Sequence, residues 1–142
     1  MPRPFPLLRA AEVPDDPALD TALVDFDHAV HVLIGLDPEP HGRFSRAYVT
    51  AIFRACLAPR LPGPDAPRGR PDPQIVDALK AWIRVQLREH ANEAQEPRLA
   101  AARRAAHGFW LQSLAVPLDE EGRPSAERML EELLGLTRPA LA

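Results

Sequence analysis

The sequence is poor in the residues that form the most recognisable catalytic and metal sites. Cys56 is the only cysteine among 142 residues, which excludes an intrachain disulfide and a cysteine-rich zinc site. The sequence also contains no glycine-rich phosphate loop, no Gly-x-Ser-x-Gly turn and no His-Glu-x-x-His pair. These absences favour a protein without enzymatic activity, so we predict no catalytic residue and no cofactor.

Long apolar runs and aromatic side chains are scarce as well. No run approaches the roughly 18 apolar residues of a membrane-spanning helix, and residues 1–16 contain no apolar stretch typical of a signal peptide. We therefore expect a soluble, cytoplasmic protein with no membrane partner. Because aromatic residues make up 6% of the chain, aliphatic and alanine side chains are expected to fill most of the core.

Proline, in contrast, is abundant and unevenly placed. Seventeen prolines stand against seven glycines, and they cluster at 2–17, 38–40, 59–73 and 117–124, where they separate the segments between them. We predict one helical domain over residues 1–142. An irregular arm at 1–15 precedes it, and an exposed proline-rich linker at 59–72 interrupts it.

Apolar residues recur every three to four positions between these breaks, which predicts helices and no strand. Helices are expected to begin near Asp16, His41, Asp72, Glu96 and Ser125, three of them at a proline that suits a first helical turn. An alternative joins the third and fourth into one helix over 74–115, kinked at Pro97. The predicted fold class is all-α, a four- to five-helix bundle.

Two aspartates and two histidines stand close together in the first helix, within "VDFDHAVHVL" at 24–33. On a helical wheel His28 and His31 lie opposite the apolar stripe, and Val24 lies on their side. Asp27 and His31 are four residues apart, a spacing that allows a hydrogen bond. A surface that is neither strongly charged nor strongly apolar suits a contact with another helix or a second subunit. We predict that Val24, His28 and His31 belong to a protein interface.

A metal site is an alternative reading of the same stretch. Helical bundles with two irons use carboxylates and Glu-x-x-His pairs, and Asp25 and His28 have the corresponding spacing. The third helical segment adds a reversed pair, but the second helix carries no acidic residue that could complete the set. The residues that would form this site are Asp27, His28, His31, His90 and Glu93.

Charge is distributed unevenly along the chain. Residues 1–40 hold two arginines and eight acidic residues, residues 41–110 hold twelve basic and six acidic residues, and residues 111–142 hold three basic and six acidic residues. The acidic ends could neutralise the basic middle within the fold or across a dimer, and an external anionic partner is the other interpretation. Basic charge comes from sixteen arginines and a single lysine, a bias typical of a GC-rich, bacterial-like composition.

Basic residues at helical spacing also offer a phosphate-binding surface. In addition, "PRGRP" at 67–71 resembles the core of an AT-hook, which implies an extended Arg-Gly-Arg segment in the minor groove of AT-rich DNA. Asp65 and Asp72 flank it, where AT-hooks usually carry further basic residues. The residues of this nucleic-acid alternative are Arg43, Arg46, Arg54, Arg68, Arg70, Lys80, Arg84 and Arg88.

Taken together, the sequence predicts a non-enzymatic helical-bundle protein that acts through protein–protein contacts. A homodimeric adaptor or regulatory subunit is the form that we favour. The alternatives are a nucleic-acid-binding helical protein and a metal-dependent helical-bundle enzyme.

Overall fold

The computed structural model describes residues 17–58, 73–116 and 118–139. These residues form α-helices and no strand, which confirms the predicted all-α class. The predicted arm at 1–15 and the whole of the predicted linker at 59–72 lie outside the described residues. The helices are α1 (Pro17–Leu36), α2 (Arg43–Leu57), α3 (Pro73–Glu89), α4 (Ala91–Ala94), α5 (Pro97–Ala115) and α6 (Arg123–Leu136).

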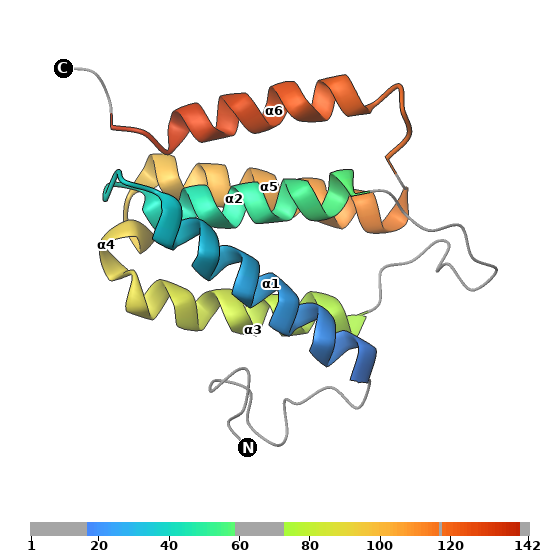
Figure 1. Cartoon of the computed structure of the whole chain (residues 1–142), viewed down its shortest axis with the longest axis horizontal. Coiled ribbons are helices and arrows are strands. Elements are labelled where there is room, and N and C mark those ends of the chain that lie inside the picture. The colour runs from blue at the N-terminus through green and yellow to red at the C-terminus, as the bar shows by residue number, and fades with distance from the viewer. Residues whose placement is uncertain (1–16, 59–72, 117, 140–142) are drawn as a thin grey trace.

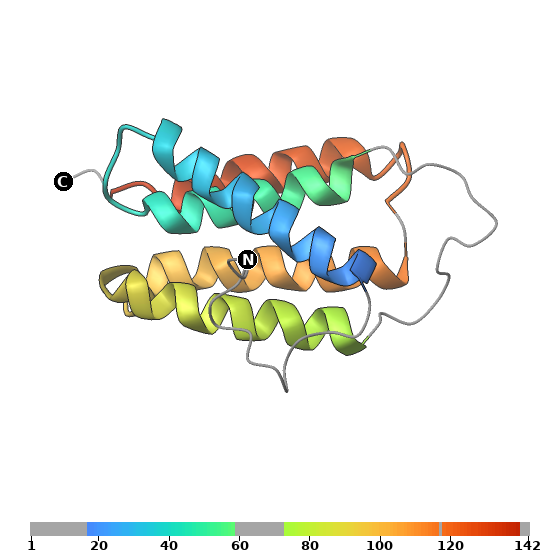
Figure 2. The same ribbon diagram turned by 60° about the horizontal axis from the view of Figure 1, so that its bottom comes forward.

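The helices lie in two layers. α1, α2 and α6 form one layer, and α3 and α5 form the other, with the one-turn helix α4 between them along the chain (Figures 1 and 2). α1 crosses over α2 and reaches α3, while α6 packs on α2 and α5 (Figure 1). None of the helices in the described residues has the length and apolar character needed to cross a membrane.

α2 is the central helix of the molecule. It packs against α1, α5 and α6, and ten of its fifteen residues are buried. By helical spacing, the sequence of α2 predicts an apolar stripe from Phe44 through Tyr48 and Ile52 to Ala55, widened by Val49 and Cys56, with the arginines opposite Tyr48. Phe44, Tyr48 and Ile52 are indeed buried, but Ala55 is exposed and Arg46 is buried. The pattern therefore located one face of α2 correctly and underestimated how much of the helix its neighbours cover.

Four aromatic residues gather where α1, α2 and α3 meet. The ring of Phe26 lies 5.1 Å from that of Trp82 in an edge-on arrangement, and Trp82 stacks against Tyr48 at 6.1 Å. Phe44 joins the same cluster, 6.3 Å from Tyr48. Aromatic pairs at such distances contribute about 0.5–1.5 kcal/mol each beyond the area that they bury. Although the chain has few aromatic residues, these four side chains pack together at one junction of three helices.

The chain between α3 and α5 is not one kinked helix. α3 ends at Glu89, α4 adds a single turn, and α5 begins at Pro97 as the sequence predicted. α4 itself was not predicted, because four residues are too short to show a helical period. At the other end, α6 begins at Arg123, after Gly122, so the predicted start at Ser125 was wrong by two residues.

Candidate functional site

The predicted interface residues occupy two different environments on α1. His28 and His31 are exposed, as the helical wheel predicted, while Val24 is half-buried and packs against the core. Nδ1 of His31 lies 3.4 Å from Oδ1 of Asp27 and 2.8 Å from the Asp27 carbonyl oxygen. Oδ1 of Asp27 also accepts a hydrogen bond of 2.9 Å from Nε1 of Trp82. Asp27 thereby links the exposed histidine to the aromatic core.

One face of α1 is exposed and nearly uncharged. Val32 and Leu36 are two of the large hydrophobic residues that the described part of the chain leaves exposed, at 45% and 74% of their full area. They are one turn apart and stand between small residues on the same face. We call this surface the α1 face; its exposed residues are Thr21, Asp25, His28, Ala29, Val32, Gly35 and Leu36.

The five residues of the metal alternative do not converge. No group of three or more histidine, cysteine, aspartate or glutamate side chains within the described ranges could hold a metal ion. His90 stacks its ring on Phe44 at 4.7 Å, and Glu93 is buried at the start of α2. Asp27, as shown above, is engaged by Trp82. The geometry therefore gives this alternative no support.

Glu93 closes the N-terminal end of α2. Its Oε2 accepts a hydrogen bond of 2.9 Å from the backbone N–H of Phe44, and its Oε1 accepts one of 2.9 Å from that of Ser45. The first N–H groups of a helix have no partner within the helix, and they carry partial positive charge. A carboxylate from α4 therefore serves α2 as a cap from 48 residues away along the chain.

Sequence reasoning missed this role of Glu93, although a signal was present. The sequence shows that glycine, which has no side chain to cap a helix, precedes α2 at position 42, and that the first turn of α2 contains no acidic residue. A helix without either needs an acceptor from elsewhere in the fold.

Arg103 of α5 completes this buried polar cluster. Its Nη1 donates to Oγ of Ser45 at 2.7 Å and to the backbone carbonyl of Glu93 at 3.3 Å. Burial lowers the pKa of Arg103, whereas the negative charge of Glu93 and the hydroxyl of Tyr48 act in the opposite direction. The guanidinium stays charged at neutral pH. Arg103 and Glu93 thus connect α2, α4 and α5 by contacts that are structural.

Arg46 is not available to phosphate, contrary to the prediction. It is buried, and its Nε donates to Oδ2 of Asp37 at 2.7 Å. Nη1 donates to the Thr137 carbonyl at 2.9 Å, and Nη2 donates to the Glu39 carbonyl at 2.7 Å. Burial tends to raise the pKa of Asp37, but hydrogen bonds from Arg46 and from the Glu39 backbone outweigh it, so this pKa lies below its ordinary value.

The other predicted phosphate-binding residues differ in how far they are exposed to solvent. Arg43 is half-buried and donates to the backbone carbonyls of Glu39 and Pro38. Arg68 and Arg70 lie outside the described residues. The exposed members of the set are Arg54 on α2 and Lys80, Arg84 and Arg88, which follow one another at four-residue steps on α3.

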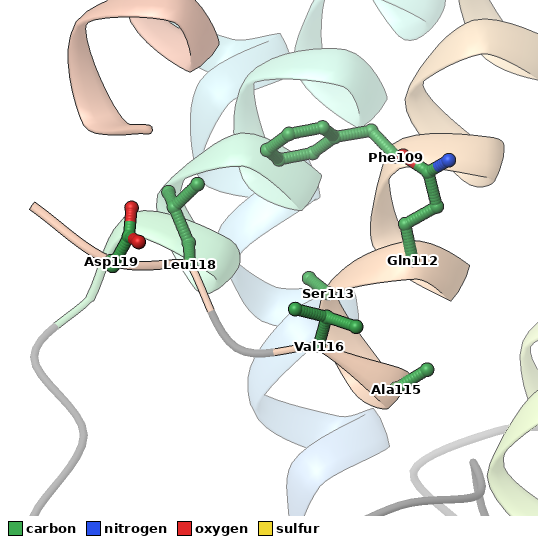
Figure 3. Close-up of a pocket in the computed structure, with 7 residues that line it drawn as sticks. All are labelled: Phe109, Gln112, Ser113, Ala115, Val116, Leu118 and Asp119. Carbon is green, nitrogen blue, oxygen red and sulfur yellow. The ribbon is translucent and has the colours of Figure 1, made fainter. Parts of the chain in front are cut away.

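An open pocket lies where α5 ends and the chain turns toward α6 (Figure 3). Its volume is about 380 Å³, and the side chains of Phe109, Val116 and Leu118 supply its apolar walls. Two of the polar side chains at its edge make local hydrogen bonds, since Ser113 Oγ donates to the Trp110 carbonyl and Asp119 Oδ1 accepts from the Gly122 N–H. We therefore do not place the functional site in this pocket.

Comparison with known proteins adds no assignment to this geometry. No known protein family, curated protein or solved structure matches the chain.

Proposed function

We propose that the protein acts without catalysis, through protein–protein contacts, and that it self-associates through the α1 face. The observation that carries this proposal is the composition of that face. Its seven exposed residues include one formal charge, Asp25, together with exposed Val32 and Leu36. The solvent-facing side of α6 differs sharply, because it presents Glu127, Arg128, Glu131 and Glu132.

The chemistry of the α1 face suits the approach of a second helix. Ala29 and Gly35 have little or no side chain, so another backbone can come close to them. Burying Val32 and Leu36 would gain roughly 25 cal/mol for each Å² of apolar surface removed from water. In a two-fold dimer both copies use the same patch, so one such face is sufficient for both sides of the contact.

The size of the α1 face sets the expected strength of the contact. A 20-residue helix is about 30 Å long, and stable dimers usually bury about 800 Å² on each partner. α1 has 20 residues, and the α1 face presents seven exposed residues, fewer than the roughly 20–30 residues that a standard interface uses on each side. We therefore expect a dimer whose formation depends on concentration in the micromolar range rather than an obligate assembly.

Sedimentation over a range of concentrations tests this proposal. The unmodified protein should move from monomer to dimer as concentration rises, and the double variant Val32→Glu with Leu36→Glu should stay monomeric. The matched control is Val116→Glu, because Val116 is 74% exposed and lies beyond the end of α5. This control should dimerise like the unmodified protein. An unmodified protein that remains monomeric throughout, or a control that is equally impaired, contradicts the proposal.

Nucleic-acid binding is the second candidate, and one specific observation favours it. Lys80, Arg84 and Arg88 are exposed in succession along α3, and each phosphate contact releases counterions from a duplex. A mobility-shift titration with salt separates the two candidates. Replacing Lys80, Arg84 and Arg88 together by glutamine gives the test variant. Binding that weakens steeply with salt and is lost in this variant would support nucleic-acid binding. No binding at low salt would exclude it.

A further inference from the structure

A groove lies between α3 and α5. These two helices belong to the same layer (Figure 2) and make little direct contact with each other. The volume of the groove is about 420 Å³, within the range of roughly 300–1,000 Å³ that is common for small-molecule sites. α3 supplies one wall and α5 the other, while Tyr48 of α2 reaches the groove from the opposite layer. The groove involves none of the residues of the α1 face.

Basic side chains are concentrated on both walls of the groove. Lys80 lines it from α3, and Arg103, Arg104 and His107 line it from α5, whereas no carboxylate is among its described lining residues. Lys80 and Arg104 are exposed, and neither forms an ion pair within the described part of the chain. The neighbouring carboxylate of Glu93 is occupied by the two N–H groups of α2.

The basic groups are close enough to influence one another. Burial lowers the pKa of His107, and the charge of Lys80 across the groove lowers it further. The charge of Arg104 likewise contributes to the lowered pKa of Arg103, after the larger effect of burial. Like charges held together in this way repel each other, and an anion bound between them would relieve the repulsion.

The hydroxyl of Tyr48, which also lines the groove, is an uncharged hydrogen-bond donor. Its oxygen lies 3.5 Å from Nδ1 of His107. Burial raises the pKa of Tyr48, although the charge of Arg103 opposes this in part. The hydroxyl therefore stays protonated at neutral pH and does not introduce a negative charge that would compete with an anion.

The remainder of the groove is apolar. Ile83 and Leu87 line it from α3, and Ala94, Ala100 and Gly108 leave space along the opposite side. Inorganic phosphate would use the basic groups and leave this surface exposed to water. A ligand with a charged head and a hydrocarbon body would use both parts.

We propose that the groove between α3 and α5 binds a small organic anion, in which one carboxylate or phosphate group is attached to an apolar body. The charged head would lie between Lys80 and Arg104, within reach of His107. The apolar body would lie against Ile83 and Leu87.

Calorimetric titration with octanoate and octyl phosphate tests this proposal and distinguishes the two head groups. At least one of the two should bind saturably, while octanol and inorganic phosphate should each bind at least tenfold more weakly. The double variant Lys80→Gln with Arg104→Gln should weaken anion binding by about tenfold or more. The control Arg54→Gln with Arg128→Gln removes the same amount of charge from exposed sites outside the groove. This control should change the affinity for the anion less than twofold.

The imidazole of His107 reports directly on where the ligand lies. Its pKa, followed by NMR, should rise when the bound anion favours the protonated ring. Failure of both anions to saturate at millimolar concentration would overturn the proposal, as would octanol binding as tightly as octanoate. Inorganic phosphate binding equally well, an unmoved His107, or an equal loss in the control variant would also overturn it.

Discussion

Glu93 of α4 connects three helices through hydrogen bonds to α2 and α5. Its two carboxylate oxygens accept from the N–H groups of Phe44 and Ser45, and its backbone carbonyl accepts from Arg103. A buried N–H without an acceptor costs about 1–3 kcal/mol. The residue therefore contributes through the groups that it satisfies rather than through charge attraction alone.

Replacement of Glu93 tests this role. Glu93→Ala should lower the free energy of unfolding by about 3 kcal/mol, because it leaves two buried N–H groups without their acceptor and removes the negative charge that stabilises the buried Arg103 guanidinium. Urea denaturation measures the change through the transition midpoint. The control Glu89→Ala, at an exposed position of α3, should stay within about 0.5 kcal/mol of the unmodified protein. Equal effects of the two variants would rule out the capping role.

Sequence reasoning succeeded best at residues whose environment is set by their own helix. His28 and His31 are exposed as predicted, because their angle to the Phe26 stripe follows from helix geometry alone. Arg46 and Arg103 could not be placed in this way. Arg46 has one partner 91 residues away along the chain and Arg103 has one 58 residues away, so their burial depends on how helices pack.

At the scale of elements, prolines were the most informative residues. α5 begins at Pro97 as predicted, and Pro73 is the first residue of α3. Proline lacks the N–H that a first helical turn cannot use, so its position carries information without tertiary context. α4 and the central position of α2 lacked such a signal. The groove was also missed, because its walls come from separate helices that periodicity cannot bring together.

Arg46 connects elements that are distant in the sequence. It holds Asp37 and the Glu39 carbonyl of the α1–α2 loop, together with the Thr137 carbonyl at the end of α6. Gly42 lies in the same tight space, with φ at 72°, and a Cβ there would overlap the Thr137 carbonyl oxygen. The loop before α2 and the end of α6 are therefore held against each other by backbone as well as side-chain contacts.

The ion pair between Asp37 and Arg46 gives the fold a predictable acid sensitivity. The pKa of Asp37 lies below its ordinary value, so the ionised carboxylate stabilises the folded state. This stabilisation is fully present above about pH 4 and is lost as the pH falls through the lowered pKa. Asp37→Asn should cost about 1–2 kcal/mol at pH 7. The cost should shrink toward pH 3, as measured by urea denaturation at each pH. A cost that is the same at both pH values would contradict this assignment.

At the scale of the whole molecule, the uneven charge along the chain is cancelled within the fold only in part. Asp37 of the acidic N-terminal segment neutralises Arg46 of the basic middle. Lys80 and Arg104 of the α3–α5 groove have no such partner within the described residues. The molecule thus presents two surfaces of different chemistry, a nearly uncharged helix face on α1 and a basic groove between α3 and α5.

The central claim is that two copies meet through the α1 face, and an intermolecular distance tests it most directly. Cys56 is buried and is the only cysteine of the chain, so Cys56→Ala leaves a background in which one spin label can be attached at a chosen position. A label at Asp25→Cys, on the α1 face, should give a dipolar distance between copies shorter than that from a label at Val116→Cys. Absence of dipolar coupling at position 25 under dimer-forming conditions, or a shorter distance at position 116, would contradict the claim.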